Sequence, residues 1–360
     1  MLAEIHQQSV LARSWAQAGG YQVAGIADAV ASFAPTCIAL IARGTSDNAA
    51  GYAKYLLEIM GGYVVSSTSP STMTLYGARP RPARTLCIAV SQSGQSPDLV
   101  QSMAAFRESG SLGIAVTNDP ASPLALQADH VIPLAAGHEE AVAATKTFTC
   151  TLLALLDLAS AICGSAPPDR TAIAGAITSV IGDAGPTSNP NANDPVDPAG
   201  PVDALAAAVS LLEPSMHAAR HLLVVSRGAS TPIAHEGALK IMETVGLPAL
   251  SYSTADLEHG PIACVQPGTP ILVVDSAGPT AHSMEPVITR LLGRGAQVVQ
   301  VGSADPVAGV GAHIRLPRLD PLAAPIVEAI PLQLLAYRLA IAVGRDPDQP
   351  EGLTKVTRTH

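Results

Sequence analysis

The feature that most constrains the fold is an internal repeat, in which the second half of the chain restates the first half 184 residues later. The parts that recur at this spacing are Arg43-Gly44 with Arg227-Gly228, Gly62 with Gly246, segment 89–94 with 273–278, and segment 114–116 with 298–300. A spacing that stays constant over several apolar segments indicates a duplicated structural unit. We therefore predict two copies of one fold.

Each copy alternates short apolar segments with longer segments of helical periodicity. In the first copy we expect strands at 38–42, 64–65, 86–90, 113–116 and 131–134, and helices at 48–60, 98–108 and 147–161. Such alternation is typical of βαβ units, whose parallel sheet is covered by helices on both faces. The predicted fold class is α/β, with two tandem doubly wound parallel-sheet domains.

The domain boundaries follow from changes in composition along the chain. We expect N-terminal helices over 1–34, a first domain over 35–165, a linker over 166–202, a second domain over 203–345 and a tail over 346–360. Residues 185–201 include five prolines and almost no large apolar side chains. Such a segment buries too little surface to offset its ordering entropy, so we predict a mobile insertion rather than a lid.

Composition excludes several classes of protein. The formal net charge of −9 argues against nucleic acid as the main partner, because phosphate backbones require clustered Lys and Arg. The five cysteines lack metal-ligand spacing and favour a reducing compartment. We find no signal peptide and no uninterrupted apolar run of membrane-spanning length. A cytoplasmic protein without membrane contact, metal or organic cofactor is expected.

A hydroxyl-rich turn, Ser91-Gln92-Ser93-Gly94-Gln95-Ser96, follows the predicted strand 86–90 and precedes a predicted helix. A strand, turn and helix in this order direct backbone N–H groups and a positive helix end at one point, which suits a phosphate. A polar loop that only caps its helix is the alternative, because serine is a preferred cap residue. The second copy has Asp275 and Ala277 where the first has Ser91 and Ser93, so only the first copy should bind an anion.

The second copy offers groups for proton transfer instead. Glu236, Lys240 and Glu243 are spaced by four and three residues, which places them on one face of a helix. His259 follows in the turn Glu258-His259-Gly260-Pro261, and imidazole exchanges protons near neutral pH. A solvated charged stripe and an exposed histidine are the alternatives, and neither feature is specific by itself.

Taken together, these motifs resemble the sugar isomerase (SIS) family, and in particular the isomerase half of glucosamine-6-phosphate synthase. The resemblance covers nearly the whole chain except the 185–201 insertion, and it implies a flavodoxin-like fold for each domain. The matching segments, in order, are Arg43-Gly44-Thr45-Ser46, Ser91 to Ser96, Val142-Ala143-Ala144-Thr145-Lys146, Glu236 to Glu243, Glu258 to Pro261 and the tail Gly352 to Thr357.

The resemblance also implies roles for individual residues. Glu243 would move a proton between C1 and C2 of a hexosamine 6-phosphate or related phosphosugar. His259 would assist ring opening, Lys240 and Glu236 would orient the open chain, and Lys355 would reach the carbonyl end. The residues implied in substrate binding are Gly44, Thr45, Ser46, Ser91, Gln92, Ser93, Ser96, Val142, Ala143 and Ala144. Because His259 would come from the neighbouring subunit, a homodimer with sites at the interface is implied.

Departures from the synthase pattern shape the expected reaction. The synthase carries a glutaminase domain, whereas this chain enters the sugar-binding half soon after Met1. The synthase also typically has Glu, Thr and Ser at the positions that Gln95, Ser96 and Ala144 occupy here. We therefore expect glucosamine-6-phosphate deamination, which gives fructose 6-phosphate and ammonia. A glutamine-independent aminotransferase-like isomerase and a fructosamine-6-phosphate deglycase are enzymatic alternatives. A non-catalytic sugar-phosphate sensor is a further alternative.

Overall fold

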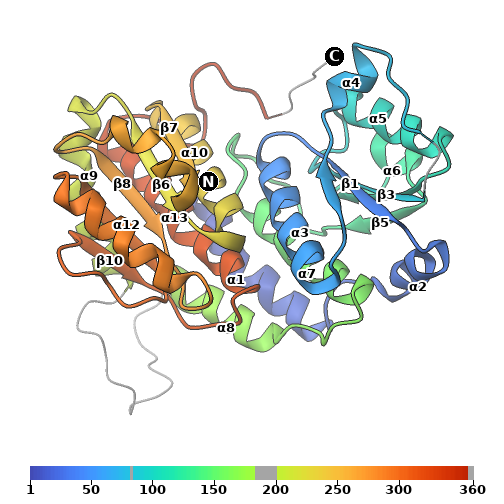
Figure 1. The fold of residues 1–360 in the computed structure, drawn as a ribbon, viewed down its shortest axis with the longest axis horizontal. Coiled ribbons are helices and arrows are strands. Elements are labelled where there is room, and N and C mark those ends of the chain that lie inside the picture. The colour runs from blue at the N-terminus through green and yellow to red at the C-terminus, as the bar shows by residue number, and fades with distance from the viewer. Residues whose placement is uncertain (82–83, 183–200, 356–360) are drawn as a thin grey trace. The chain divides into compact units, whose positions relative to one another are not determined.

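The computed structural model describes residues 1–81, 84–182 and 201–355. The chain divides into two compact units (Figure 1). We call Leu11–Arg170, with the tail that starts at Glu351, the first-repeat unit, and Met1–Val10 with Thr171–Pro350 the second-repeat unit. Each unit contains one five-stranded sheet in which all strand pairs are parallel, which confirms the predicted α/β fold of two doubly wound sheets.

The first sheet has the order β2-β1-β3-β4-β5. Its strands are β1 (Cys37–Ile41), β2 (Val65–Ser67), β3 (Thr85–Val90), β4 (Leu112–Thr117) and β5 (His130–Pro133). The helices α2 to α7 are Ala24–Phe33, Thr45–Gly61, Pro70–Thr74, Pro97–Glu108, Pro123–Gln127 and Lys146–Ile162, and α1 spans Leu2–Gln17.

Side-chain alternation explains why this sheet is covered on both faces. Ala39, Ile41 and Cys87 pack with α4, α5 and α6 in one core, whereas the alternate strand residues point to the face that α3 and α7 cover (Figure 1). All six residues of β3 are buried, as expected for a central parallel strand.

The second sheet repeats this topology, in the order β10-β9-β8-β6-β7. Its strands are β6 (Leu222–Ser226), β7 (Ala249–Ser253), β8 (Pro270–Val274), β9 (Gln297–Gly302) and β10 (Ala312–Arg315). The helices α8 to α13 are Arg170–Ile181, Pro201–Ala218, Thr231–Val245, Thr254–Glu258, Ala281–Gly293 and Ala324–Ala342, with 3-10 turns η1 (Gly228–Ser230) and η2 (Pro261–Cys264).

The strand register confirms the repeat and corrects it at one point. Ile41 pairs with Ala89 in the first sheet, and Val225 pairs with Val273 in the second, so the spacing of 184 residues holds for these central strands. Leu86 pairs with Leu112, however, whereas Pro270 pairs with Gln297. The equivalent of segment 114–116 therefore begins one residue later than predicted, because the second copy has one extra residue between β8 and β9.

Several predicted element boundaries also need correction. Helix α3 begins at Thr45 rather than at residue 48, so Thr45 and Ser46 lie in its first turn instead of in a loop. Strand β2 covers Val65–Ser67 rather than 64–65. Helix α8 forms within the stretch assigned to the linker. The prediction of a mobile insertion falls almost entirely outside the described residues.

Within the described ranges, one helix, α13, is long and apolar enough to cross a membrane by length and composition, but 83% of its most apolar window is buried within the protein. It packs against α10 and α9 and supplies core residues such as Ile326, Ile330 and Leu335. The search for uninterrupted apolar runs missed α13 because Glu328, Gln333 and Arg338 interrupt its sequence. This is the pattern of a core helix.

Candidate functional site

In the first-repeat unit, two loops lie next to each other at the carboxyl edge of the sheet because β1 and β3 are neighbouring strands. After β1, Gly44 adopts a positive φ of 54° and leads directly into α3. After β3, residues 91–96 lead into α5, which begins with Pro97. Both helices therefore present their N-terminal N–H groups at the same edge, which favours an anion.

The 91–96 turn is held by its own serines. The hydroxyl of Ser91 accepts a hydrogen bond from Gly94 N at 3.1 Å, and that of Ser93 accepts one from Gln95 N at 3.3 Å. Ser96 occupies the N-cap position of α5, but its side chain makes no capping hydrogen bond. The alternative in which Ser96 serves only as a helix cap is therefore not what the geometry shows.

An ion pair ties the two loops together. Arg43 Nε donates to Asp98 Oδ2 at 2.8 Å, and Asp98 is only 2% exposed. Asp98 Oδ1 also accepts a hydrogen bond from Leu99 N at 2.9 Å. Sequence analysis did not single out Asp98 as a site residue, although it follows the serine turn directly. Arg43 is therefore positioned beside the turn by a buried carboxylate.

Gly94 makes the turn sensitive to side-chain size. It has φ of 61°, and a Cβ atom there would lie 2.1 Å from Ser122 Oγ. Gly62, with φ of 63°, has no atom within 4 Å of such a Cβ. We expect Gly62→Ala to cost about 1 kcal/mol of unfolding free energy, from the backbone alone. Gly94→Ala should cost about 3 kcal/mol, because the clash is added.

Urea unfolding of the two variants beside the wild-type protein measures this difference. Equal losses of stability in Gly94→Ala and Gly62→Ala would contradict the packing of the serine turn against Ser122.

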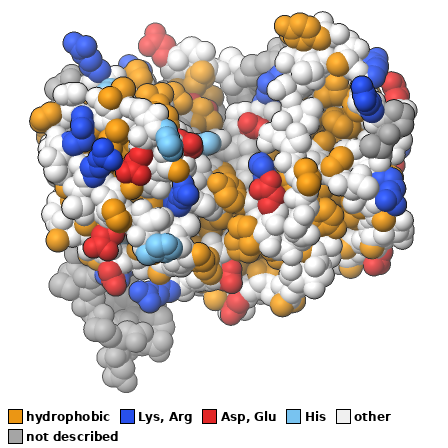
Figure 2. Space-filling view, viewed as in Figure 1, with side chains coloured by type: hydrophobic (Ala, Val, Ile, Leu, Met, Phe, Trp, Pro, Cys, Tyr) orange, Lys and Arg blue, Asp and Glu red, His pale blue; other side chains and the backbone are white. Residues whose placement is uncertain are grey.

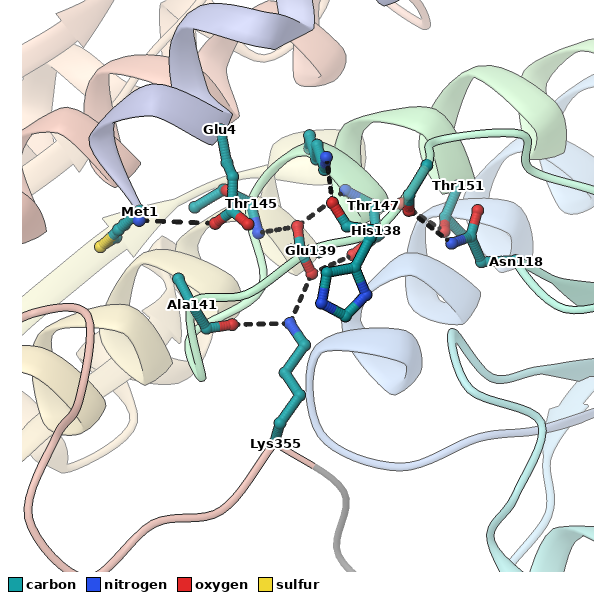
Figure 3. A network of polar contacts seen from close by, with 12 residues as sticks. Met1, Glu4, Asn118, His138, Glu139, Ala141, Thr145, Thr147, Thr151 and Lys355 are labelled. Atoms are coloured by element: carbon teal, nitrogen blue, oxygen red, sulfur yellow. Dashed lines mark hydrogen bonds and ion pairs between the residues drawn. The ribbon is translucent and has the colours of Figure 1, made fainter.

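A third loop of the first-repeat unit, residues 138–147, is organised around Glu139 (Figure 3). Glu139 Oε1 accepts hydrogen bonds from Thr145 N at 3.0 Å and Thr147 N at 3.1 Å, and its Oε2 accepts one from Thr147 Oγ1 at 2.7 Å. The implied substrate loop Val142-Ala143-Ala144 lies inside this frame, and Ala143 is fully buried.

Lys355 of the C-terminal tail joins the same loop. Its Nζ donates to Glu139 Oε2 at 2.6 Å and to the carbonyl of Ala141 at 2.7 Å (Figure 3). The side chain of Glu139 is fully buried, whereas that of Lys355 is 24% exposed. The structure therefore brings Lys355 to the predicted Val142-Ala143-Ala144 loop, through a carboxylate that sequence analysis missed.

The partners of Glu139 decide its charge state. Burial opposes ionisation, but the ammonium of Lys355 and the hydrogen bonds from Thr145 and Thr147 outweigh burial and lower the pKa of Glu139. Because the folded-state pKa lies below the unfolded one, the ionised group stabilises the fold above the unfolded pKa. That stabilisation is lost as the pH falls through the folded-state pKa.

We therefore expect Glu139→Gln to lower the unfolding free energy by about 1–3 kcal/mol at neutral pH. Its stability should also fall less steeply than that of the wild type as the pH drops below about 4.3. Chemical unfolding across pH measures both effects, and Glu140→Gln, at the exposed neighbouring carboxylate, is the control. Parallel pH profiles for Glu139→Gln and wild type would contradict this account of the loop.

In the second-repeat unit, α10 carries the predicted acid–base face. Lys240 Nζ lies 3.3 Å from Glu236 Oε1 and also donates to Glu243 Oε2. Lys240 is fully buried and Glu236 is 2% exposed, whereas the side chain of Glu243 is 21% exposed. The spacing prediction is confirmed, and burial of Lys240 and Glu236 excludes a solvated stripe.

Lys240 is charged despite its burial. Desolvation alone would lower the pKa of this ammonium, but Glu236 and Glu243 together raise it above its ordinary value. Within the trio, Glu243 is the more solvent-accessible carboxylate.

Among the residues that the structure describes, the imidazole of His259 makes no hydrogen bond or ion pair with this trio. His259 follows α11 in an exposed turn, and its backbone N–H donates to Asp256 O at 3.2 Å. Gly260, at φ of 139°, then redirects the chain into η2.

The predicted site residues thus fall into two groups. The first-repeat unit holds the implied substrate-binding residues and Lys355, and the second-repeat unit holds Glu236, Lys240, Glu243 and His259. An apolar pocket of about 380 Å³ also lies in the first-repeat unit, lined by residues such as Trp15, Tyr21 and Leu134. Its apolar walls do not suit a phosphate.

On the face drawn in Figure 2, the Lys and Arg side chains of the described residues are dispersed among acidic ones, with no continuous basic patch.

Comparison with known proteins places these motifs in a family. The SIS domain family model matches residues 35–161 and 215–343. Glutamine–fructose-6-phosphate aminotransferase (isomerizing) of Zymomonas mobilis is 32% identical over 324 residues, covering 88% of this chain and 51% of that protein. The corresponding Pyrobaculum aerophilum protein is 33% identical and covers 99% of this chain and 56% of its own length. The chain thus spans about half the length of these relatives.

Solved structures agree on the fold. The C-terminal domain of glucosamine-fructose-6-phosphate aminotransferase from Francisella tularensis is 25% identical, with a TM-score of 0.78 over 97% of this chain and 98% of that one. Glucosamine-6-phosphate deaminase from Thermotoga maritima is 20% identical, with a TM-score of 0.76 over 99% of each chain, and shares the fold. With two tandem matches that follow its internal repeat, the chain belongs to the SIS domain family.

Proposed function

We propose that the protein is a phosphosugar enzyme that converts glucosamine 6-phosphate and water into fructose 6-phosphate and ammonia. The observation that carries this proposal is the buried Glu236–Lys240–Glu243 trio, which leaves one ionisable carboxylate, Glu243, accessible to a substrate. A sensor needs to bind a ligand but has no use for such a trio. Burial of a full ion-paired set is costly, so its presence favours catalysis over binding alone.

The substrate would be anchored through its phosphate in the first-repeat unit. The residues proposed to hold the phosphate and hydroxyls are Gly44, Thr45, Ser46, Ser91, Gln92, Ser93 and Ser96, with Val142, Ala143 and Ala144 lining the same unit. A neutral hydroxyl and N–H cradle binds a dianion by oriented hydrogen bonds and helix ends. The binding energy of the phosphate then holds the reacting carbons in place.

The proposed chemistry is a proton shuttle followed by hydrolysis. Glu243 takes the proton from C2 of the open-chain amino aldose, and the electrons form a C1–C2 enolamine as O1 takes up a proton from solvent. The proton that Glu243 took returns to C1, which leaves an imine at C2, and the nitrogen gives one proton back to solvent as this imine forms. Water adds to this imine and ammonia leaves, so the products are fructose 6-phosphate and ammonia. Proton transfer by a positioned carboxylate contributes about 10²–10⁴-fold.

Other residues complete the proposal. Lys355, held by Glu139, would stabilise negative charge that develops on the carbonyl oxygen, and Lys240 and Glu236 would orient the chain. His259 would assist ring opening, and its exposure suits a residue that serves a neighbouring subunit. A homodimer with interfacial sites and a cytoplasmic location are parts of the same proposal.

The names of the matched relatives support a second candidate. Their activity is amination of fructose 6-phosphate, so this chain would then run the isomerisation toward glucosamine 6-phosphate with a supplied amine. Gln95, Ser96 and Ala144 depart from the synthase pattern and favour deamination. They also leave a fructosamine-6-phosphate deglycase as an alternative substrate specificity.

The test is ammonia release from glucosamine 6-phosphate, with fructose 6-phosphate measured in the same tube by a coupled enzyme. Equal amounts of both products support deamination. Product formed only from fructose 6-phosphate and ammonium would favour the aminotransferase-like reaction over deamination. Product formed only from a fructosamine 6-phosphate would favour the deglycase reaction. Binding of the phosphosugars without turnover of any of them would favour the non-catalytic sugar-phosphate sensor as the function.

A further inference from the structure

In the second-repeat unit, buried polar atoms without hydrogen-bond partners gather at the carboxyl edge of the sheet. Ser226 ends β6, and Asp275 and Ser276 follow β8, the strand beside it. Glu328 lies early in α13 and is fully buried, and Asp275 is 4% exposed. The unpartnered atoms at this edge are both carboxylate oxygens of Glu328, Asp275 Oδ1 and the hydroxyls of Ser226, Ser276 and Thr231, whereas His221 Nε2 is unpartnered in another part of the unit.

The elements that carry the two carboxylates lie side by side, because α13 packs against η1 and against β9, the strand next to β8. Burial raises the pKa of Asp275 to about 7, and the charge of Glu328 contributes to that rise. Burial likewise raises the pKa of Glu328 to about 7. The nearby hydroxyls of Ser276 and Ser230 partly offset this rise, although neither has the geometry of a regular hydrogen bond to the carboxylate. Two carboxylates in a dry environment do not both stay ionised unless a cation compensates them.

The protein supplies no such cation among the described residues. Neither carboxylate forms an ion pair with a lysine, arginine or histidine in the described part of the chain. Lys240 on neighbouring α10 is already held by Glu236 and Glu243. Asp275 receives one neutral hydrogen bond, from Gln300 Nε2 to its Oδ2 at 3.2 Å, and Gln300 is itself fixed by Val307 N and Asp305 O.

The internal repeat shows that this position is the counterpart of the serine turn. Ser91 corresponds to Asp275, and Ser46 corresponds to Ser230, at the spacing of 184 residues that holds for these strands. The hydroxyl at 230 is retained, whereas the neutral hydroxyl at 91 is replaced by a carboxylate. The same loop edge that suits an anion in the first repeat therefore carries negative charge in the second.

We infer that Asp275 and Glu328 form a binding site for a hard divalent cation, of the Mg²⁺ or Ca²⁺ class, at the carboxyl edge of the second sheet. The unpartnered atoms that follow β6 and β8, together with those of Glu328, are oxygens, which such cations prefer, and two carboxylates balance a charge of two. With only two charged ligands, the dissociation constant should be about 10⁻⁴–10⁻³ M. The site is separate from the proposed reaction and does not depend on it.

The test is thermal unfolding of the full chain after treatment with a chelator, at slightly alkaline pH. Addition of MgCl₂ or CaCl₂ to about 10 mM should raise Tm by about 2–4 °C over NaCl of equal ionic strength. Glu328→Gln and Asp275→Asn should each unfold at a higher Tm than wild type without the cation and should lose the response to it. Glu285→Gln, at an exposed position on α12, should respond as wild type does.

Three outcomes would overturn the inference. No response to either divalent cation, with stability that rises at lower pH in wild type but not in Glu328→Gln, would mean that the pair holds a proton instead. An unchanged response in both Glu328→Gln and Asp275→Asn would place the cation elsewhere. If NaCl or KCl raised Tm as much as the divalent salts do, the site would not be specific for divalent cations. Because the readout is unfolding, none of these outcomes depends on turnover.

Discussion

Glu243→Gln is expected to reduce ammonia release from glucosamine 6-phosphate by about 10²–10⁴-fold, because an amide cannot accept the C2 proton. The substitution preserves the size of the side chain at a position that is only 21% exposed. Lys240 keeps Glu236 as its counter-charge, so the buried ammonium does not become unpaired. The loss should therefore fall on kcat, with KM close to the wild-type value.

The matching controls separate proton transfer from general damage. Glu285→Gln removes a carboxylate from the exposed face of α12 and should leave kcat unchanged. Glu243→Asp keeps the charge but shortens the side chain, so it should retain more activity than Glu243→Gln. A thermal unfolding curve for each variant checks the fold. Full turnover by Glu243→Gln would remove Glu243 as the base and leave the buried trio without a catalytic role.

The repeat made most of the fold predictable from sequence. Continuous apolar runs such as Leu86–Val90 identify central parallel strands, because those strands are buried on both faces. Errors arose where short-range signals are ambiguous. Thr45 and Ser46 are typical of both turns and first helical turns, so the start of α3 was placed too late. The apolar face of α8, with Ile173, Ile177, Val180 and Ile181 at helical spacing, lies in a stretch that was assigned to the linker. The one-residue shift before β9 is visible only in strand pairing.

The sequence indicated which helix face and which loops carry the candidate site residues, but it did not indicate which of their side chains are buried. Helical spacing put Glu236, Lys240 and Glu243 together, yet spacing cannot show that Lys240 is fully buried, which turns a charged stripe into an ion-paired set. Glu139 and Glu328 were missed for the same reason. Their buried contacts come from segments far apart in the chain, as in the bond from Lys355 to Glu139, so a local pattern cannot reveal them.

The two repeats allow a matched comparison for phosphate binding, because the same substitution can be made at equivalent positions of each. Ser93→Asp puts a carboxylate into the turn that is proposed to hold the phosphate, and Ala277→Asp puts the same group at the equivalent position of the second repeat. Both positions are partly exposed, so the carboxylate can be hydrated in the free protein. At position 93 the new side chain can still accept the hydrogen bond that Ser93 now receives from Gln95 N.

Ser93→Asp should raise KM for glucosamine 6-phosphate by about 100-fold, since the loss of a charge-assisted hydrogen bond and the repulsion together cost about 3 kcal/mol. Ala277→Asp should leave KM unchanged. Steady-state kinetics on the two variants gives the comparison, and inorganic phosphate as a competitive inhibitor should weaken in parallel with the substrate only in Ser93→Asp. Equal increases in KM in both variants would mean that added negative charge acts from a distance. An unchanged KM in Ser93→Asp would mean that the phosphate binds elsewhere.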